Sequence, residues 1–289
     1  MLEAMATSAT LTTSDHNRNA AGLKYIYPVI SRRAGGLSIG VNFNVNNACN
    51  WRCLYCQVPG LQLGAPPAMD FQLLERELRL FLTDVLQGDF YDRFQFDQEH
   101  RVIKDIAISG NGEPTSLSDF DRAVELIGRI ATELKVFPES HFVLISNGSL
   151  VHQAGVQAGL MTLKRYGGEV WFKFDSATEV GRKLINNTAQ SLVRAKENLL
   201  LSARLCPTKI QTCLVDYCGQ GLSAIERDAY VRFLAQLKPK TNIRKVMLYT
   251  LARPSCQPEA GQIKPLPVEV MTHLADAVRA LGFDVSVSV

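Results

Sequence analysis

The sequence has 289 residues, of which 46% are hydrophobic and 20% are charged, a composition that excludes a disordered or fibrous chain. The length is normal for a single α/β barrel, and the net charge of +3 neither implies nor excludes a polyanionic partner. Seven cysteines, an odd number, argue against a disulfide scaffold.

The first residues lack the hydrophobic segment of a usual signal peptide, and no apolar run approaches the length that spans a bilayer. We therefore expect a cytoplasmic protein without membrane segments, in a reducing compartment. Residues 1–22 are polar and rich in Ser, Thr, Ala and Asn, so they are expected to form a disordered tail. Residues 23–289 are expected to form one domain.

An alternating pattern begins at residue 37 and predicts a half-buried strand. Small polar residues separate its apolar members, which are Leu37, Ile39, Val41, Phe43 and Val45. In a barrel the apolar set packs on the surrounding helices, while Asn42 and Asn44 point toward the interior. Before this strand, residues 23–36 are expected to be an ordered lead-in that ends in a turn.

Beyond this strand, predicted helices and strands alternate to the end of the sequence. Asp70 is expected to cap the first helix, residues 89–101 to form a loop, and Ser118 to cap the second helix. This alternation predicts βαβ units with a parallel sheet, either a barrel or a doubly wound sheet. Further strands are predicted over 103–109, 142–146, 169–175, 210–215, 245–250 and 284–289, and further helices over about 152–165, 189–204, 223–237 and 268–281.

Three cysteines, Cys49, Cys53 and Cys56, lie in one short segment directly after the first of these strands. Thiolates are the ligands that iron–sulfur clusters require, and three of them leave one iron of a four-iron cluster without a protein ligand. A zinc knuckle would need a fourth Cys or His nearby, and the sequence has none close to the triplet. The triplet therefore predicts a cluster with an open iron.

A second motif, Gly110-Asn111-Gly112-Glu113, follows the strand predicted over 103–109. Two glycines let the backbone come close to a ligand, and the carboxylate of Glu113 would lie near a cationic group. An ordinary strand-to-helix turn is the alternative interpretation. Asn147, at the end of the next predicted strand, is either a turn residue or a ligand contact.

Lys173 and Asp175 share one face of the strand predicted over 169–175, together with Trp171. Charged groups inside a barrel are costly unless they are paired or bound to a ligand, so either an interior ion pair or a ligand contact is expected. Arg253 follows the strand predicted over 245–250 and is a candidate for an anion contact. Candidates for a nucleobase or substrate region are Gln211, Thr212, Tyr249 and Pro254.

Four further cysteines lie outside the triplet. Cys206 and Cys213 are expected to be buried and inert, because Cys213 lies inside a predicted strand and Cys206 precedes that strand. Cys218 and Cys256 follow two of the strands, and they remain open as reactive thiols or partial ligands.

These motifs occur in this order on successive predicted strands, and an aromatic residue, Tyr55, precedes the last cysteine of the triplet. The pattern resembles the radical S-adenosylmethionine (SAM) superfamily, closest to the branch with wyosine-base synthases and glycyl-radical activating enzymes. The resemblance covers the chain from about residue 23 and implies a partial (β/α)6 TIM-type barrel whose open side admits substrate.

The resemblance also implies cofactors and roles. Cys49, Cys53 and Cys56 would hold a 4Fe–4S cluster, and the loop Gly110, Asn111, Gly112 and Glu113 would hold the amino group of SAM. Lys173 is assigned to the SAM carboxylate and Asp175 to its ribose, with Asn147 and Arg253 as further cofactor contacts. A low-potential donor of the flavodoxin or ferredoxin type would supply the electron.

The activity implied is reductive cleavage of SAM to a 5′-deoxyadenosyl radical, which abstracts hydrogen from a substrate that the sequence does not identify. The substrate could be a tRNA base, a protein or peptide, or a small metabolite. A zinc- or cluster-bearing binding protein is the non-enzymatic alternative.

Overall fold

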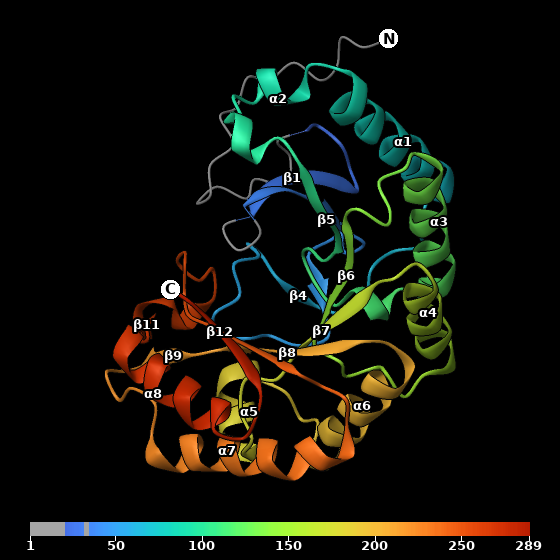
Figure 1. Ribbon diagram of the computed structural model, residues 1–289. Helices are drawn as coiled ribbons and strands as arrows, with labels where there is room; N and C mark the ends of the chain where they lie inside the picture. The colour runs from blue at the N-terminus through green and yellow to red at the C-terminus, as the bar shows by residue number, and fades with distance from the viewer. Residues whose placement is uncertain (1–20, 32–34) are drawn as a thin grey trace.

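The structure is a computed structural model that describes residues 21–31 and 35–289 (Figure 1). The tail expected over residues 1–22 lies almost wholly outside the described residues. Among the helices that are described, none combines the length and the apolar character that crossing a membrane requires.

The main sheet has the strand order β1-β2-β5-β6-β7-β8-β10-β12. All neighbouring pairs are parallel except β1 and β2, which are antiparallel. The order never reverses along the chain, so the doubly wound alternative is wrong and the partial barrel is confirmed. The strands are β1 (Ile26–Ser31), β2 (Gly36–Val41), β5 (Ile103–Ile108), β6 (His141–Ser146), β7 (Glu169–Lys173), β8 (Thr208–Cys213), β10 (Lys245–Tyr249) and β12 (Asp284–Ser288).

Two short pairs of strands lie at the carboxyl ends of the barrel strands. The first joins β3 (Ala48–Cys49) to β4 (Gln62–Leu63), and the second joins β9 (Val215–Tyr217) to β11 (Ile263–Pro265). Strand β3 lies at the start of the cysteine segment and β4 follows its end. Their pairing therefore fixes the positions of both ends of that segment.

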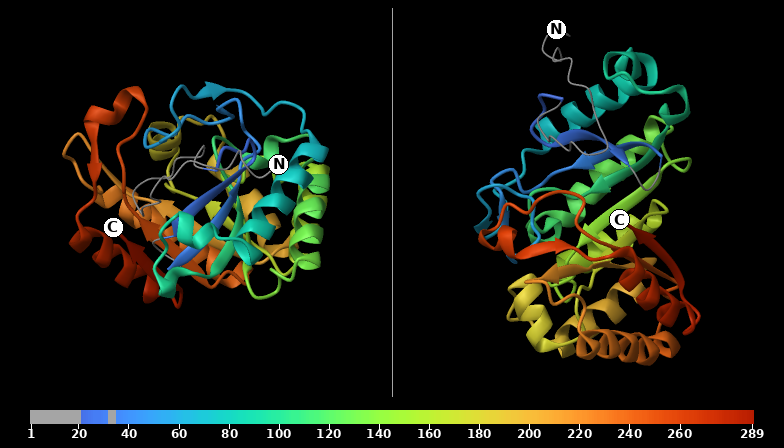
Figure 2. Two further views of the ribbon diagram at one scale, coloured as in Figure 1. Left: turned by 90° about the horizontal axis from the view of Figure 1, so that it is seen from above. Right: turned by 90° about the vertical axis from the view of Figure 1, so that its left-hand side faces the viewer.

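Helices cover the outer side of the curved sheet (Figures 1 and 2). Their bounds are α1 (Phe71–Gln87), α2 (Phe90–Arg93), α3 (Phe120–Glu133), α4 (Ala154–Arg165), α5 (Glu179–Asn186), α6 (Leu192–Leu205), α7 (Ala224–Leu237) and α8 (Val268–Arg279), with 3-10 turns η2 (Gln98–His100), η3 (Pro114–Ser116), η4 (Lys238–Lys240) and η5 (Pro258–Gln262).

The alternation along each strand divides its side chains between two environments. On β5, Ile106 and Ile108 are fully buried in the main hydrophobic core, whereas Asp105 and Ala107 line an interior cavity. The same division holds on β2, where Ile39 lies in the core. This two-sided burial is what a barrel strand requires, and it places polar side chains inside the barrel.

Side chains cap the N-termini of α1, α5, α6 and α7. Asp70 caps α1 as predicted, because its carboxylate accepts a hydrogen bond from Leu73 N at 2.9 Å. The predicted cap Ser118 is wrong by one residue: α3 begins at Phe120, and Asp119 occupies the cap position.

Three segments differ from the sequence prediction. The lead-in contains β1, an edge strand in which Pro28 is tolerated. The region expected as a loop over 89–101 contains α2 and η2, because Phe90 packs against Phe94 and Phe96 with ring centroids 4.6 and 5.9 Å apart. The helix α5 was not predicted at all.

Candidate functional site

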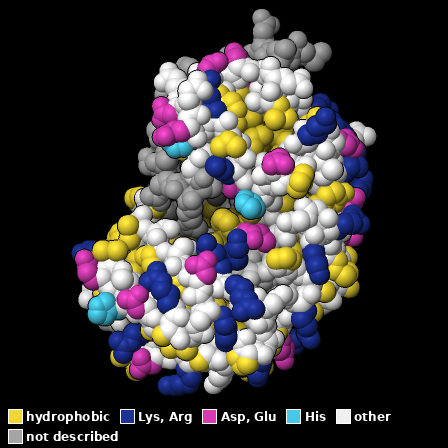
Figure 3. Space-filling view, viewed as in Figure 1, with side chains coloured by type: hydrophobic (Ala, Val, Ile, Leu, Met, Phe, Trp, Pro, Cys, Tyr) yellow, Lys and Arg dark blue, Asp and Glu magenta, His cyan; other side chains and the backbone are white. Residues whose placement is uncertain are grey.

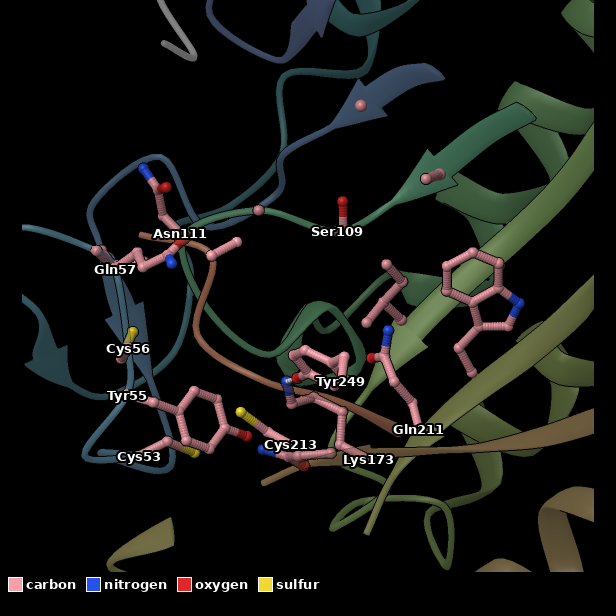
Figure 4. A pocket seen from close by; sticks show the side chains of 18 of the residues that line it. Cys53, Tyr55, Cys56, Gln57, Ser109, Asn111, Lys173, Gln211, Cys213 and Tyr249 are labelled. Atoms are coloured by element: carbon pink, nitrogen blue, oxygen red, sulfur yellow. Dashed lines mark hydrogen bonds between the residues drawn. The ribbon is translucent and has the colours of Figure 1, made fainter. Parts of the chain in front are cut away.

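A cavity of about 620 Å³ lies inside the barrel, a size common for small-molecule sites. Its wall includes inward side chains of the strands, the cysteine segment and the loops that follow β5 and β10 (Figure 4). Barrel enzymes place their chemistry at this carboxyl end of the strands. Of the residues predicted for the site, the cavity wall brings together Cys49, Cys53, Cys56, Gly110, Asn111, Gly112, Glu113, Asn147, Lys173 and Arg253, but not Asp175.

The cysteine loop, residues 49–56, holds three half-buried thiols that all line this cavity. Backbone contacts fix it from two sides. Leu54 N donates to Ile185 O of α5 at 2.9 Å, and the amide of Cys256 donates to Cys56 O at 2.8 Å. The hydroxyl of Ser255 also donates to Leu54 O at 2.7 Å, so the loop is held in one conformation.

Polar side chains add two further ties to the cysteine loop. Arg52 forms a bidentate ion pair with Glu259 at 2.7 and 2.8 Å. Asn50 donates to Ser149 Oγ at 2.7 Å and accepts from the Asn147 amide at 2.9 Å. These contacts join the loop to the end of β6 and to the segment after β10, which are distant in sequence.

Burial controls the protonation of the thiols. Burial raises the pKa of Cys49 to about 12 and that of Cys53 to about 11, with the Asp175 carboxylate adding to the effect at Cys53. The Asn186 amide lies 3.4 Å from Cys53 Sγ as a hydrogen-bond donor and opposes that rise in pKa. The free thiols of Cys49 and Cys53 are therefore protonated at neutral pH, and a metal that binds them must displace protons.

The donor groups do not converge on a single ion. Among the described residues, no set of three His, Cys, Asp or Glu side chains could hold one metal ion. A structural zinc site needs such convergence. An iron–sulfur cluster instead takes each thiolate on a different iron and does not require this convergence.

The glycines of the loop after β5 are required by close packing. A Cβ on Gly112 would lie 1.9 Å from Ala48 O, and one on Gly110 would lie 2.3 Å from Asn42 Oδ1. Gly110 also has a positive φ of 149°, which side chains other than hydrogen rarely allow. This loop therefore lies directly against the start of the cysteine loop.

Asn111 presents a free acceptor within this loop. Its amide nitrogen donates to Asn47 Oδ1 at 2.6 Å, and its backbone N donates to Asn42 Oδ1 at 3.0 Å. Its Oδ1 is buried without a hydrogen-bond partner in the part of the chain that is described. Asn111 itself lines the cavity, and a buried, unpaired carbonyl oxygen is suited to accept a hydrogen bond from a ligand.

Glu113 is almost fully buried and joins the loop after β5 to the end of β6. It accepts hydrogen bonds from the Thr115 and Ser146 hydroxyls at 2.6 and 2.7 Å, and from Asn147 N at 2.7 Å. Burial raises its pKa, and these donors oppose the rise. The carboxylate is thus fixed in place at the cavity wall.

Lys173 lies between two aromatic rings (Figure 4). Its ammonium is 5.0 Å from the centre of the Tyr55 ring and 5.6 Å from that of Tyr249, and it donates to the Tyr249 hydroxyl at 2.9 Å. Burial lowers the pKa of Lys173, but the acidic groups Tyr249 and Asp175 outweigh burial and raise the pKa above its usual value. The side chain is therefore a fixed cation at the cavity wall.

Asp175 lies beyond the end of β7 and does not line the cavity. Its carboxylate accepts from Cys213 N at 2.8 Å, from the Asn186 amide at 2.7 Å and from the Tyr55 hydroxyl at 2.5 Å. No ion pair joins Asp175 to Lys173, so the interior ion pair considered from the sequence is absent between these two described residues. Through its hydrogen bond with the Tyr55 hydroxyl, the Asp175 carboxylate holds the cysteine loop in position.

The remaining predicted residues divide between the cavity and the surface. Arg253 lines the cavity, and its carbonyl accepts from the Gln57 amide at 3.3 Å. Cys206 is buried as expected, whereas Cys213 is buried but also forms part of the cavity wall. The exposed cysteines are Cys218 and Cys256.

Two functional candidates were missed from the sequence. Asn186 lies on α5, a helix of eight residues whose apolar residues Val180 and Leu184 are exposed, so a search for a buried apolar face did not indicate it. Asp105 lines the cavity from β5, and the alternation within the predicted strand over 103–109 was a signal that could have found it.

Comparisons with solved structures support the fold. A structure of TYW1 with a lysine–pyruvate adduct bound matches with a TM-score of 0.54 at 15% identity, over 86% of this chain and 74% of that chain. A radical SAM methyltransferase from Sphaerobacter thermophilus matches with 0.56 at 14% identity, over 91% and 68%. The structure of native anSMEcpe with AdoMet and a peptide matches with 0.54 at 12% identity, over 86% and 62%.

Among curated proteins, GTPase Obg of Brachyspira hyodysenteriae (strain ATCC 49526 / WA1) is 25% identical over 136 residues. The match covers 46% of this chain, which spans only 17% of the length of that protein. The Gly-Lys pair that ends a P-loop occurs nowhere in the printed sequence, so this match carries no nucleotide-hydrolysis motif.

A sequence model described as the radical SAM superfamily matches residues 43–234. This range is more than half of the chain, and it contains the cysteine loop, the loop after β5 and the strands from β5 to β8. The chain belongs to the radical SAM superfamily.

Proposed function

We propose that this protein cleaves SAM reductively at a 4Fe–4S cluster and uses the resulting 5′-deoxyadenosyl radical to abstract hydrogen from a substrate inside the barrel. The observation that carries the proposal is the cysteine loop, whose three thiols line one cavity together with Asn111, a residue whose Oδ1 has no hydrogen-bond partner among the described residues. One electron from a low-potential donor of the flavodoxin or ferredoxin type breaks the carbon–sulfur bond and releases methionine; the radical then takes a hydrogen atom and becomes 5′-deoxyadenosine.

In this proposal, Cys49, Cys53 and Cys56 hold the cluster. Their positions fit the group, because the three separated thiols line one cavity and the side chains hydrogen-bonded to Cys49 and Cys53 are neutral amides. Bound there, the cluster and SAM supply electron transfer and the carbon radical. The chain itself supplies ligation, orientation and a wall that excludes water.

The loop Gly110, Asn111, Gly112 and Glu113 holds the amino group of SAM. Asn111 Oδ1 is an acceptor without a partner in the described part of the chain, and the buried carboxyl group of Glu113 lies in the same loop. Asn147 completes this wall, since its backbone fixes Glu113 and its side chain fixes Asn50.

Lys173 and Arg253 are assigned to anionic and polar parts of SAM. The Lys173 ammonium is held on the cavity wall by Tyr249, and it would bind the SAM carboxylate. The ribose role expected for Asp175 is replaced in our proposal by a positioning role, because three donors already occupy its oxygens. Arg253 stays a cofactor contact at the rim.

The descriptions of the structural neighbours suggest other substrate classes, among them a peptide. The size of the interior cavity favours a small molecule instead. One neighbour is described with a lysine–pyruvate adduct bound, and another with a bound peptide. On the face in Figure 3, Lys and Arg side chains are interspersed with Asp and Glu rather than gathered in one basic patch of the kind that nucleic acids attract. The interior cavity is of small-molecule size.

Anaerobic reconstitution with iron and sulfide tests the cluster assignment. We expect four irons and four sulfides per chain, with loss of brown absorbance in Cys53→Ala. Cys218→Ala is the matched control, because Cys218 is exposed and lies outside the cavity wall, and it should keep the full cluster. A cluster that persists in Cys53→Ala, or that is absent from the wild type, would contradict the proposal and leave the binding-protein alternative.

A further inference from the structure

Part of the cavity wall is not used by the residues proposed for the cofactors. It consists of Ser38, Asp105, Trp171 and Gln211, and we call it the cavity floor. Asp105 lies three residues before the end of β5 at Ile108, roughly 10 Å along the strand, and Gly110 lies beyond that end. The floor is thus well separated from the loop proposed to hold SAM.

Asp105 is a carboxylate that pairs with no cation among residues 21–31 and 35–289. Its side chain is 7% exposed and accepts a hydrogen bond from the Ser38 hydroxyl. Among the described residues, its oxygens form no ion pair, whereas Glu169 on β7 is paired with Lys209 at 2.6 Å. A buried carboxylate that lacks a cationic partner destabilises the folded state unless a ligand compensates it.

The neighbouring charges do not provide that compensation. Burial raises the pKa of Asp105; the Ser38 hydroxyl and His141 lower it, and Glu169 raises it again. His141 is exposed at the start of β6, so its effect reaches Asp105 from outside the cavity. The floor therefore has an excess of negative charge directed into the cavity.

Gln211 gives an independent indication of a ligand. Its side chain is 4% exposed, and its amide forms no hydrogen bond with any described residue. Figure 4 shows that this amide points into the cavity from β8. An amide that is directed into a cavity without a protein partner is available to form hydrogen bonds with a ligand that carries polar groups.

Trp171 supplies a flat apolar wall between these groups. Its indole Nε1 donates to Glu169 Oε1 at 2.7 Å, which fixes the ring on β7. The ring therefore needs no hydrogen bond from a ligand and offers only a surface for carbon atoms.

We infer that the cavity floor binds a small primary amine in its cationic form, with the ammonium on Asp105 and Ser38, a second polar group on Gln211, and the carbon skeleton against Trp171. This inference rests on the proposed function, because it names the class of substrate from which hydrogen is abstracted. The charge and the unpaired amide select this class over carboxylic acids and over hydrocarbons.

Binding of head-group analogues tests the inference without any cluster or SAM. Butylamine, butanol and butyrate have the same chain and differ in charge, and their binding to the full-length protein is measured by ligand-observed NMR titration. We expect butylamine to bind at least roughly tenfold more tightly than butanol, and butyrate not to bind. Equal binding of butylamine and butanol would overturn the inference.

Two variants test whether the preference for butylamine depends on Asp105. Asp105→Asn keeps the shape of the side chain and the acceptor for Ser38, and it should abolish the preference for butylamine. Asp284→Asn makes the same chemical change at an exposed position on β12 and should leave the preference intact. A preference that survives in Asp105→Asn would place the amine elsewhere and contradict the assignment.

Gln211 is tested with amino alcohols of increasing chain length, from aminopropanol to aminohexanol. One member should bind several-fold more tightly than the matching alkylamine, and Gln211→Leu should remove this gain while leaving alkylamine binding unchanged. If no amino alcohol gains over its alkylamine, the role of Gln211 is wrong. Because none of these measurements requires SAM cleavage, failure of the amine site and failure of the proposed function are separately visible.

Discussion

Asn186 connects the cysteine loop to the carboxylate beneath it. Its amide donates to Asp175 at 2.7 Å and lies 3.4 Å from Cys53 Sγ. Hydrogen bonds to the sulfur ligands of an iron–sulfur cluster stabilise its more negative, reduced state, and they therefore raise its reduction potential. The Asn186 amide is therefore expected to raise the reduction potential of the proposed cluster.

We predict that Asn186→Leu lowers the midpoint potential of the reconstituted cluster while leaving its iron content unchanged. The potential is measured by a redox titration followed by electron paramagnetic resonance. Asn187→Gly is the matched control, because residue 187 is exposed, has a left-handed φ of 47° that glycine accepts readily, and lies next to Asn186. An unchanged potential in Asn186→Leu would show that the amide does not act on the cluster.

Asn111 gives a second prediction at this scale. Its Oδ1 is buried and unpaired among the described residues, so a charge-assisted hydrogen bond from SAM would satisfy it. Asn111→Ala should weaken SAM binding by about 1.5–3 kcal/mol, roughly 10- to 100-fold. Equilibrium dialysis against the reconstituted protein measures this affinity.

Asn46→Ala is the control for that experiment, because the Asn46 amide is exposed and donates to Ala65 O outside the cavity. It should leave SAM affinity unchanged. If Asn111→Ala binds SAM as tightly as the wild type does, the acceptor role of Asn111 is wrong.

The cysteine loop is an element whose conformation is imposed by other elements. Helix α5 contributes the carbonyl of Ile185, and the segment after β10 contributes the hydroxyl of Ser255, which contacts both Leu54 O and Cys56 O at 2.7 and 3.1 Å. The loop therefore has a fixed shape before any metal binds, and this lowers the entropy lost on cluster assembly.

Ser255→Ala should loosen the loop, because it removes the donor to two buried carbonyl oxygens. The loss of these contacts should cost about 1–3 kcal/mol in local stability. Hydrogen exchange of the amides over residues 50–57 should quicken, and a chelator should remove iron faster. Ser118→Ala makes the same change at an exposed site before α3 and should have neither effect. Unchanged exchange in Ser255→Ala would contradict the role of this hydroxyl.

The sequence predicted the elements whose signals are local. The alternation over residues 37–45 and the cap at Asp70 identified β2 and α1, and the contiguous motifs Cys49–Cys56 and Gly110–Glu113 identified two walls of the cavity. Elements with weak local patterns were missed. Helix α5 has only eight residues, and its apolar residues Val180 and Leu184 are exposed rather than packed in the core.

The contacts that join these motifs were not predictable, because their partners lie far apart in the sequence. Asp175 was placed on the inner face of β7 by its spacing from Lys173, but β7 ends at Lys173 and the next turn directs Asp175 beneath the cysteine loop. Its partner Tyr55 is 120 positions away, and no single-sequence pattern connects the two.

At the scale of the whole molecule, the barrel separates two environments within one cavity. The carboxyl ends of the strands gather the thiols, the loop after β5 and Lys173, whereas the floor presents Asp105 and Gln211. The strands β1 and β12 form the two edges of the sheet, so the barrel stays open between them. Such an arrangement lets a cofactor and a substrate occupy the same interior at different depths.

The negative floor has a consequence for the stability of the whole chain. Burial raises the pKa of Asp105, with Ser38 and His141 opposing and Glu169 adding to the shift. A carboxyl group whose folded pKa exceeds its unfolded value makes unfolding easier as pH rises from about 4 through the folded pKa. Asp105→Asn removes the ionisable carboxyl group and therefore removes this decrease in stability with rising pH.

We therefore predict that the free energy of unfolding of Asp105→Asn, relative to the wild type without ligands, increases between about pH 4 and neutral pH. Urea unfolding at a series of pH values measures the difference. Asp284→Asn should show a much smaller change, because Asp284 is exposed. A difference that does not grow with pH would mean that the Asp105 carboxylate is not strained in the empty protein.

The central claim is that the cysteine loop and the cavity it faces form a site for reductive SAM cleavage. The most direct test is to incubate the anaerobically reconstituted protein with SAM and dithionite and to quantify 5′-deoxyadenosine and methionine by mass spectrometry. We predict equal amounts of the two products from the wild type and from Cys218→Ala, and neither from Cys53→Ala. Iron-loaded wild-type protein that forms no 5′-deoxyadenosine, or Cys53→Ala that still forms it, would contradict the account.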